Sequence, residues 1–131
     1  MMEPLRRVLE SEPDLAYAVL FGSAARGAGH PHSDVDVAVA FARGVEPGPL
    51  RIGSLVARLE EATGKTVDLV LLDEAPPGLA FRVFRQGVVV LDRDHGALAD
   101  RRARAMLEYL DWRPFEEIFT RGALAAASRG R

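Results

Sequence analysis

The stretch from residue 15 to residue 36 reads LAYAVLFGSAARGAGHPHSDVD and decides the fold. Residues 15–21 are almost all apolar, which is typical of a strand that is buried on both faces of a sheet. Gly22 and Ser23 then turn the chain, and ten residues later Asp34-Val35-Asp36 leads into a second apolar run that ends at Phe41. The pattern predicts two strands joined by a glycine-rich loop, with acidic residues at the start of the second strand.

The rest of the chain alternates between helical and strand patterns. This order predicts an α/β domain of the α+β-like kind, in which a sheet of about four strands is flanked by helices. Residues 1–95 would form the core, and residues 96–131 a C-terminal helical extension of the same domain. The further elements that we expect are helices at 4–11, 50–62 (ended by Gly64) and 78–86, strands at 66–72 and 88–91, and a helical segment from residue 95 with a break before Pro114.

Composition narrows the class of protein. A length of 131 residues suits one domain with its own core, and a net charge of −2 gives no overall basic field, so direct binding to nucleic acid is not expected. The absence of cysteine excludes disulfides, thiolate metal sites and cysteine nucleophiles. The N-terminus is charged and no apolar run approaches the roughly 20 residues that cross a bilayer, so we expect a cytoplasmic protein with no membrane partner.

Asp34 and Asp36 are the first candidate site residues. Side chains alternate along a strand, so both carboxylates project to one face with their Cα atoms roughly 6.5–7 Å apart, while Val35 and Val37 point to the other face. Two carboxylates held this close repel each other unless a cation lies between them. Oxygen ligands with room for water and phosphate suit Mg²⁺ or Mn²⁺.

Gly22, Ser23 and Arg26 form the complementary part of the candidate site. Glycine allows the backbone to approach a phosphate closely, and we expect Ser23 to cap a brief helix that runs through Arg26. The free N–H groups at the start of this helix and the Ser23 hydroxyl would bind the anion, and the Arg26 guanidinium could reach a phosphate oxygen.

Asp68 is the third candidate carboxylate because it is the only charged residue inside the apolar run TVDLVLL. Burying it without a partner would be costly. An adjacent strand could instead bring it beside Asp34 and Asp36, to bind a metal or to act as a general base. Taken singly, these aspartates also fit turn, cap or strand-edge positions. Their joint occurrence with Gly22-Ser23 favours a nucleotide and metal site.

Other polar and aromatic residues have ordinary explanations beside the functional ones. His30 and His32 could be transition-metal ligands, but a loop position that is exposed or lines the nucleotide pocket is favoured. Arg82 and Arg85 could reach a nucleotide or a partner, although a solvated helix face is the simpler interpretation. The C-terminal apolar residues either pack on the sheet or form an interface patch; they are Leu107, Tyr109, Leu110, Trp112, Phe115, Ile118 and Phe119.

The spacing Gly22-Ser23, ten residues, Asp34-Val35-Asp36 resembles the signature of the DNA polymerase β-like nucleotidyltransferase superfamily. Within it, the chain is similar to the minimal nucleotidyltransferases (MNT proteins). The further similarities are the short length, the ARG that follows Gly-Ser, the third aspartate in VDLVLLDEAP and the later FRVFRQGVVVLDRD. The resemblance covers about residues 3–95.

The resemblance implies a nucleotidyltransferase fold, with a small mixed sheet backed by helices. It also implies two Mg²⁺ ions (Mn²⁺ in their place is possible) and transfer of AMP from ATP to a hydroxyl acceptor, with release of pyrophosphate. Asp34, Asp36 and Asp68 would be the catalytic, metal-binding carboxylates, and Gly22 and Ser23 would hold the triphosphate.

Many MNT proteins are antitoxins of HEPN ribonuclease toxins, which they neutralise by transferring AMP to a tyrosine. The resemblance therefore implies a toxin partner, with homo- or hetero-oligomers possible through the C-terminal aromatic-rich helices. Two alternatives stay open. One keeps the chemistry with a small-molecule or RNA-end acceptor, and the other is a non-catalytic antitoxin that acts by contact.

Overall fold

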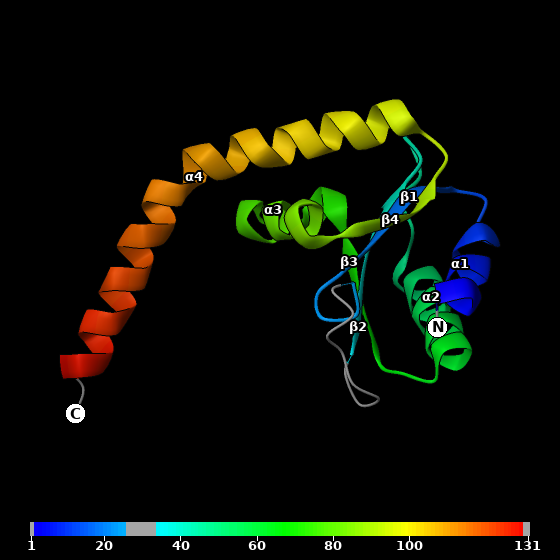
Figure 1. Ribbon diagram of the computed structural model, residues 1–131, viewed down its shortest axis with the longest axis horizontal. Helices are drawn as coiled ribbons and strands as arrows, with labels where there is room; N and C mark the ends of the chain where they lie inside the picture. The colour runs from blue at the N-terminus through cyan, green and yellow to red at the C-terminus, as the bar shows by residue number, and fades with distance from the viewer. Residues whose placement is uncertain (1, 26–33, 130–131) are drawn as a thin grey trace.

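The computed structural model of the protein describes residues 2–25 and 34–129, with side chains described as far as Pro114. Four α-helices, four strands and one short 3₁₀ helix alternate along this part of the chain (Figure 1). Their bounds are α1 Met2–Glu10, β1 Leu15–Phe21, β2 Val35–Phe41, α2 Pro49–Thr63, β3 Val67–Leu71, η1 Leu72–Glu74, α3 Pro77–Gln86, β4 Val88–Asp92 and α4 His95–Arg129.

The four strands form one mixed sheet in the order β3-β2-β1-β4. β1 is antiparallel to both β2 and β4, whereas β2 and β3 are parallel. A parallel pair needs a crossover connection, and α2 provides it between β2 and β3. The expected α+β arrangement, with a small mixed sheet and flanking helices, is confirmed.

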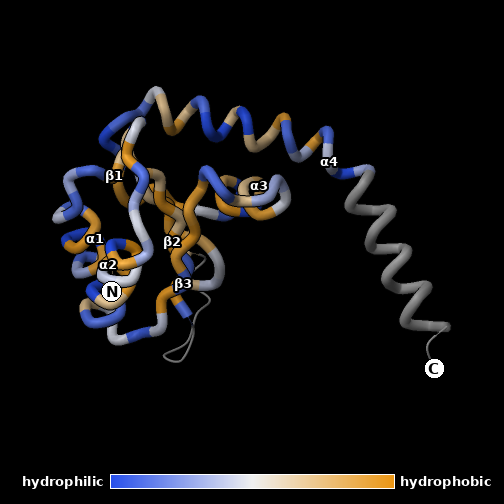
Figure 2. Tube along the Cα trace, turned by 180° about the vertical axis from the view of Figure 1, so that it is seen from behind, coloured by the Kyte–Doolittle hydropathy of each residue, from blue (hydrophilic) through white to orange (hydrophobic). Residues whose placement is uncertain are grey.

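Helices cover both faces of the sheet. One apolar core packs Leu5 and Leu9 of α1 and Leu55 and Leu59 of α2 against one sheet face. A second core lies on the opposite face, where α3 and the first part of α4 pack. Figure 2 shows the strands as the most hydrophobic stretch of the trace, between these two helical layers. We call the second face the α3–α4 face.

β1 is the central strand, and all seven of its residues are buried. Alternation divides its side chains between the two cores: Leu20 faces α1 and α2, whereas Tyr17, Val19 and Phe21 face α3 and α4. This double burial explains why the strand reads as a continuous apolar run rather than an alternating one.

α4 is one helix that continues through Pro114, so the expected break before this residue is wrong. A proline in a helix interior removes one backbone hydrogen bond and bends the axis without necessarily ending the helix. Figure 1 shows such a change of direction in the orange part of α4. Although α4 has 35 residues, no helix in the described part of the chain is long and apolar enough to cross a membrane.

A buried arginine and a ring stack attach α4 to the domain. Arg101 exposes only 6% of its surface, and its Nη2 donates a hydrogen bond of 2.9 Å to the carbonyl oxygen of Leu72. The Glu108 carboxylate lies 3.6 Å from its Nη1. Further along α4, the Tyr109 ring stacks on Phe81 of α3, with centroids 4.0 Å apart. These contacts set the position of α4 beside α3.

Alkaline pH tests the burial of Tyr17. Burial, and secondly the charge of Asp73, raises the pKa of Tyr17 above its ordinary value of 10.0. The unfolded chain therefore loses this proton first, so the contribution to stability is complete below about pH 10 and is lost as the pH rises through the folded-state pKa. We expect the free energy of unfolding, measured in urea from about pH 8 to about pH 11, to fall more steeply for the wild type than for Tyr17→Phe. Parallel curves would contradict the prediction.

Candidate functional site

The candidate site lies at the end of the sheet where β1 ends and β2 and β3 begin. Strand pairing sets Phe21 opposite Asp36, and Asp36 opposite Asp68. In-register neighbours on adjacent strands lie about 4.8 Å apart. The structure therefore brings Asp36 and Asp68 together, although 31 residues separate them in the sequence.

Both carboxylates lie on the α3–α4 face. In-register residues of neighbouring strands share a face, and alternation along β2 puts Asp36 on the same side as Ala38, which packs in the α3–α4 core. Val35 and Val37 belong to the opposite core, as predicted. Asp68 is exposed on the edge strand β3, which keeps its charge in water.

The carboxylate pair carries electrostatic strain. The pKa of Asp36 is raised above its ordinary value of 3.8, first by burial and then by the negative charge of Asp68, which also hydrogen-bonds to it. The nearby charge of Asp34 raises this pKa further, and the guanidinium of Arg82 opposes the shift. Asp34, Asp36 and Asp68 therefore interact as one acidic group, and a bound cation would relieve their repulsion.

Gly22 brings the backbone against this acidic group. Its φ of +74° is in the left-handed region that favours glycine. A Cβ built at this position would overlap Oδ2 of Asp36 and lie 3.2 Å from its Cγ. The missing side chain is therefore what allows the turn and the carboxylate to lie so close together.

The expected brief helix after Gly22 is wrong for the described residues, because Ser23–Ala25 form a turn. Ser23 nevertheless follows Gly22 directly, two residues after Phe21, which is paired with Asp36. Arg26, His30 and His32, which the sequence suggested for nucleotide binding or for the pocket, lie outside the described residues.

Arg82 lies near the site, although the sequence favoured a solvated helix face for it over contact with a nucleotide or a partner. Its guanidinium carbon lies 5.8 Å from the ring centroid of Phe21, the residue before Gly22. The side chain is exposed, and no carboxylate of the described residues forms an ion pair with it. The sequence signal for a functional role was the presence of Arg85 three positions further along the same helix. This spacing is equally typical of a solvated helix face.

The acidic group suits a metal ion whose coordination is completed by the substrate. Among the side chains that the structure describes, no set of three or more His, Cys, Asp or Glu residues is close enough to hold a metal by itself. Mg²⁺ is commonly bound by one or two carboxylates, with phosphate oxygens and water supplying the other ligands. Asp36 and Asp68, with Asp34 beside them, offer this incomplete set of oxygens.

The described C-terminal apolar residues divide into two groups, one packed on α3 rather than on the sheet and one exposed. Tyr109 stacks on Phe81, and the Trp112 ring lies beside Gly78, so these aromatic residues pack on α3. Leu107 and Leu110 are instead 64% and 58% exposed, on the outer side of α4. The side chains of Phe115, Ile118 and Phe119 lie outside the described part.

A turn at the end of one strand and acidic residues on the next two form the candidate site, and a comparison with protein families gives the class of protein in which it lies. The family model described as polymerase beta, nucleotidyltransferase matches residues 3–96. The chain therefore belongs to the polymerase beta nucleotidyltransferase family. No curated protein matches it.

Solved structures share the fold. A chain of a toxin–antitoxin complex with AMP-PNP has a TM-score of 0.81 and 22% identity, over 94% of this chain and 98% of that one. A chain from the complex of a tri-AMPylated HEPN toxin with its MNT antitoxin, from Shewanella oneidensis, has a TM-score of 0.73 and 19% identity, over 95% and 99%. A protein assigned as a minimal nucleotidyltransferase has 30% identity and a TM-score of 0.55, over 66% and 86%.

A pair of glycine substitutions tests the contact between the turn and the carboxylate. Gly22 and Gly64 have φ values of +74° and +69°, so replacement by alanine strains the backbone similarly at both. Only at Gly22 does the new Cβ meet Asp36. We expect Gly22→Ala to lower the free energy of unfolding by about 1 kcal/mol more than Gly64→Ala.

A double-mutant cycle provides the control for this prediction. In an Asp36→Ala background the overlapping oxygen is gone, so the extra loss at Gly22 should disappear in urea unfolding. An excess that persists in this background would mean that Gly22 and Asp36 are not in contact.

Proposed function

We propose that this protein transfers AMP from Mg²⁺-bound ATP to a hydroxyl group of a protein partner, and that the partner is a HEPN ribonuclease toxin. The observation that carries the proposal is the in-register pair Asp36 and Asp68, held against the left-handed turn at Gly22. Membership of the nucleotidyltransferase family supports the reaction class.

The chemistry follows from the positions of these groups. Asp34, Asp36 and Asp68 would hold two divalent cations, which supply charge neutralisation for the attacking oxygen and for the leaving pyrophosphate. The Gly22 backbone and the Ser23 hydroxyl would bind the triphosphate where β1 ends. The acceptor oxygen would form a bond to the α-phosphorus as the bond to the bridging oxygen breaks and pyrophosphate leaves. Asp68, which is exposed, would accept the hydroxyl proton.

The structure of the site supports an acceptor that comes from outside the chain. Asp34 and Asp68 are exposed, so a hydroxyl on another molecule can approach them. Similar folds occur in toxin–antitoxin complexes, one of them with a tri-AMPylated HEPN toxin. These likenesses support a toxin acceptor.

Transfer of label tests the activity. The protein, α-labelled ATP and Mg²⁺ are incubated with the protein encoded by the neighbouring gene, and the label on that protein is quantified. We expect Asp36→Asn and Asp68→Asn to lower the rate at least about 100-fold, because each removes a carboxylate charge that would hold the cations, and these cations neutralise the transferring phosphate. Asp73→Asn is the matched control, since Asp73 lies at the other end of β3, in η1.

The same variants separate catalysis from inhibition by contact. If AMP transfer neutralises the toxin, ribonuclease activity should persist with Asp36→Asn and fall with Asp73→Asn. Full neutralisation by the unlabelled Asp36→Asn mixture would instead favour the non-catalytic antitoxin. Label on an added small molecule or RNA end, with none on the protein partner, would favour the other acceptor classes.

Removal of the metal tests the carboxylate group without an acceptor. We expect a non-hydrolysable ATP analogue to raise the free energy of unfolding by about 2–3 kcal/mol when it is present at 100 times its Kd with Mg²⁺. Chelation with EDTA should remove most of this increase in the wild type. In Asp36→Asn the increase should be small even with Mg²⁺ present. An increase of the same size in both proteins, with and without the metal, would contradict the assignment of Asp36 as a metal ligand.

A further inference from the structure

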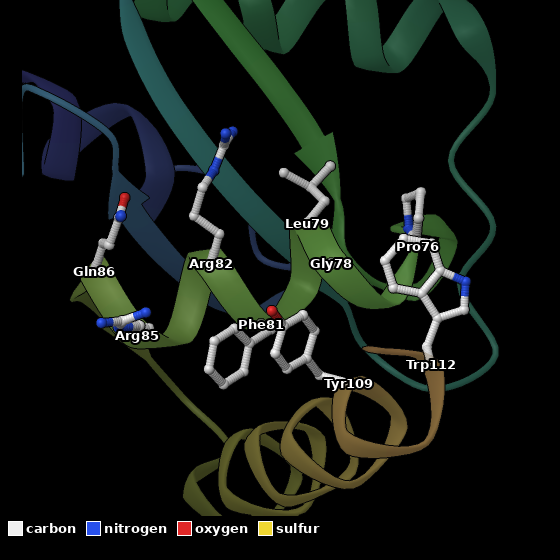
Figure 3. A pocket seen from close by; sticks show the side chains of 9 residues that line it. All are labelled: Pro76, Gly78, Leu79, Phe81, Arg82, Arg85, Gln86, Tyr109 and Trp112. Atoms are coloured by element: carbon white, nitrogen blue, oxygen red, sulfur yellow. The ribbon is translucent and has the colours of Figure 1, made fainter. Parts of the chain in front are cut away.

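A cavity of about 510 Å³ lies between α3 and α4, next to the candidate site. Gly78, Leu79, Arg82 and Arg85 of α3 line it from one side, and Tyr109 and Trp112 of α4 from the other. Figure 3 shows the Arg82 side chain rising from α3 toward the sheet, with Trp112 at the opposite end near Gly78. The volume is in the range of pockets that hold small-molecule ligands.

This cavity is on the same side of the sheet as the carboxylates. α3 and α4 cover the face to which Asp36 and Asp68 project. Arg82 connects the cavity to the carboxylates, because it lines the cavity and its guanidinium carbon lies 5.8 Å from the ring centroid of Phe21, which is paired with Asp36. A nucleotide whose triphosphate binds at the Gly22 turn would therefore extend past Arg82 into the cavity.

The far end of the cavity has flat, fixed walls. The Trp112 ring lies so close to Gly78 that a Cβ there would come within 3.3 Å of its Cζ3. The Tyr109 ring is held by its stack on Phe81, with an angle of 7° between the planes. Flat aromatic side chains of this kind are surfaces on which nucleic-acid bases stack.

We propose that this cavity is the nucleobase subsite of the nucleotide, with Trp112 and Tyr109 binding the base and Arg82 binding the triphosphate. The proposal rests on the proposed function, which it extends to the recognition of the donor. Charge favours the nucleotide over an acceptor side chain as the occupant. Arg82 and Arg85 put two exposed cations at the cavity, and these complement phosphates, whereas a neutral hydroxyl acceptor has no charge for them to neutralise.

The single tryptophan makes the proposal measurable, because Trp112 is the only one in the chain. With Mg²⁺, we expect a non-hydrolysable ATP analogue to change the fluorescence of Trp112 in a saturable way. Inorganic tripolyphosphate has no base, so it should bind at the phosphate site without this change.

Two substitutions then test the binding of the base and the binding of the phosphates separately. Trp112→Ala should weaken binding of the ATP analogue about 10-fold and leave the Kd of tripolyphosphate unchanged, and Trp112→Phe should restore most of the affinity. Arg82→Gln should weaken the binding of both ligands. Leu110→Ala, an exposed position on the same helix, is the matched control and should change neither Kd. Circular dichroism checks that each variant keeps its helices.

The outcomes separate this proposal from the proposed function. If the wild type binds the ATP analogue but the fluorescence does not change, and Trp112→Ala keeps its Kd, the base lies elsewhere and only the subsite is wrong. If Trp112→Ala keeps this Kd and slows only the transfer to the protein partner, the cavity serves the acceptor. If the wild type binds neither ligand with Mg²⁺, the proposed function is wrong together with its subsite.

Discussion

The parallel pairing of β2 with β3 is the constraint on which the candidate site depends. It sets Asp36 opposite Asp68, and the hydrogen bond of 2.9 Å from the Val35 N–H to the Thr66 carbonyl oxygen holds the strands together at this end. Since side chains alternate with a period of two, a slip of one residue would move Asp68 to the other face of the sheet. Burial of Val67 in the core formed with α1 and α2 opposes such a slip. Packing on one face of the sheet thus keeps Asp36 and Asp68 together on the other face.

The two faces of the sheet have different tasks. α1 and α2 pack on one face with leucines, and ion pairs from Arg51 to Glu12 and Asp14 join α2 to the loop before β1. The α3–α4 face combines a core with polar groups at one end, where Asp36 and Arg82 lie close together. This separation allows the acidic group to remain strained, because most of the apolar burial does not depend on it.

Local patterns were sufficient to predict most of the fold. Continuous apolar runs gave the strands, and the amphipathic pattern with Gly64 at its end predicted α2 to within a residue at each end. Alternation also put Asp36 on the face opposite Val35. These features depend on residues near one another in the sequence, where steric and periodic rules act directly.

Features that depend on distant residues were harder to predict. No local signal states that Asp68 is opposite Asp36, because the register of a parallel pair is set through a crossover helix and a shared core. Arg82 appeared to belong to a solvated face, since only the docking of α3 on the sheet brings it to Phe21. Pro114 predicted an interruption, but a bend is enough to accommodate the missing hydrogen bond.

The position of Asp68 on an edge strand also affects how the protein behaves in concentrated solution. In the described part of the chain β3 pairs with β2 on one side only, so its other edge is a template onto which a foreign strand could add. Short length and a charged side chain are the usual protections of such an edge, and β3 has five residues with Asp68 exposed among apolar ones. The negative charge of Asp68 therefore protects this edge from aggregation when no cation neutralises it. A cation bound at the site would weaken that protection.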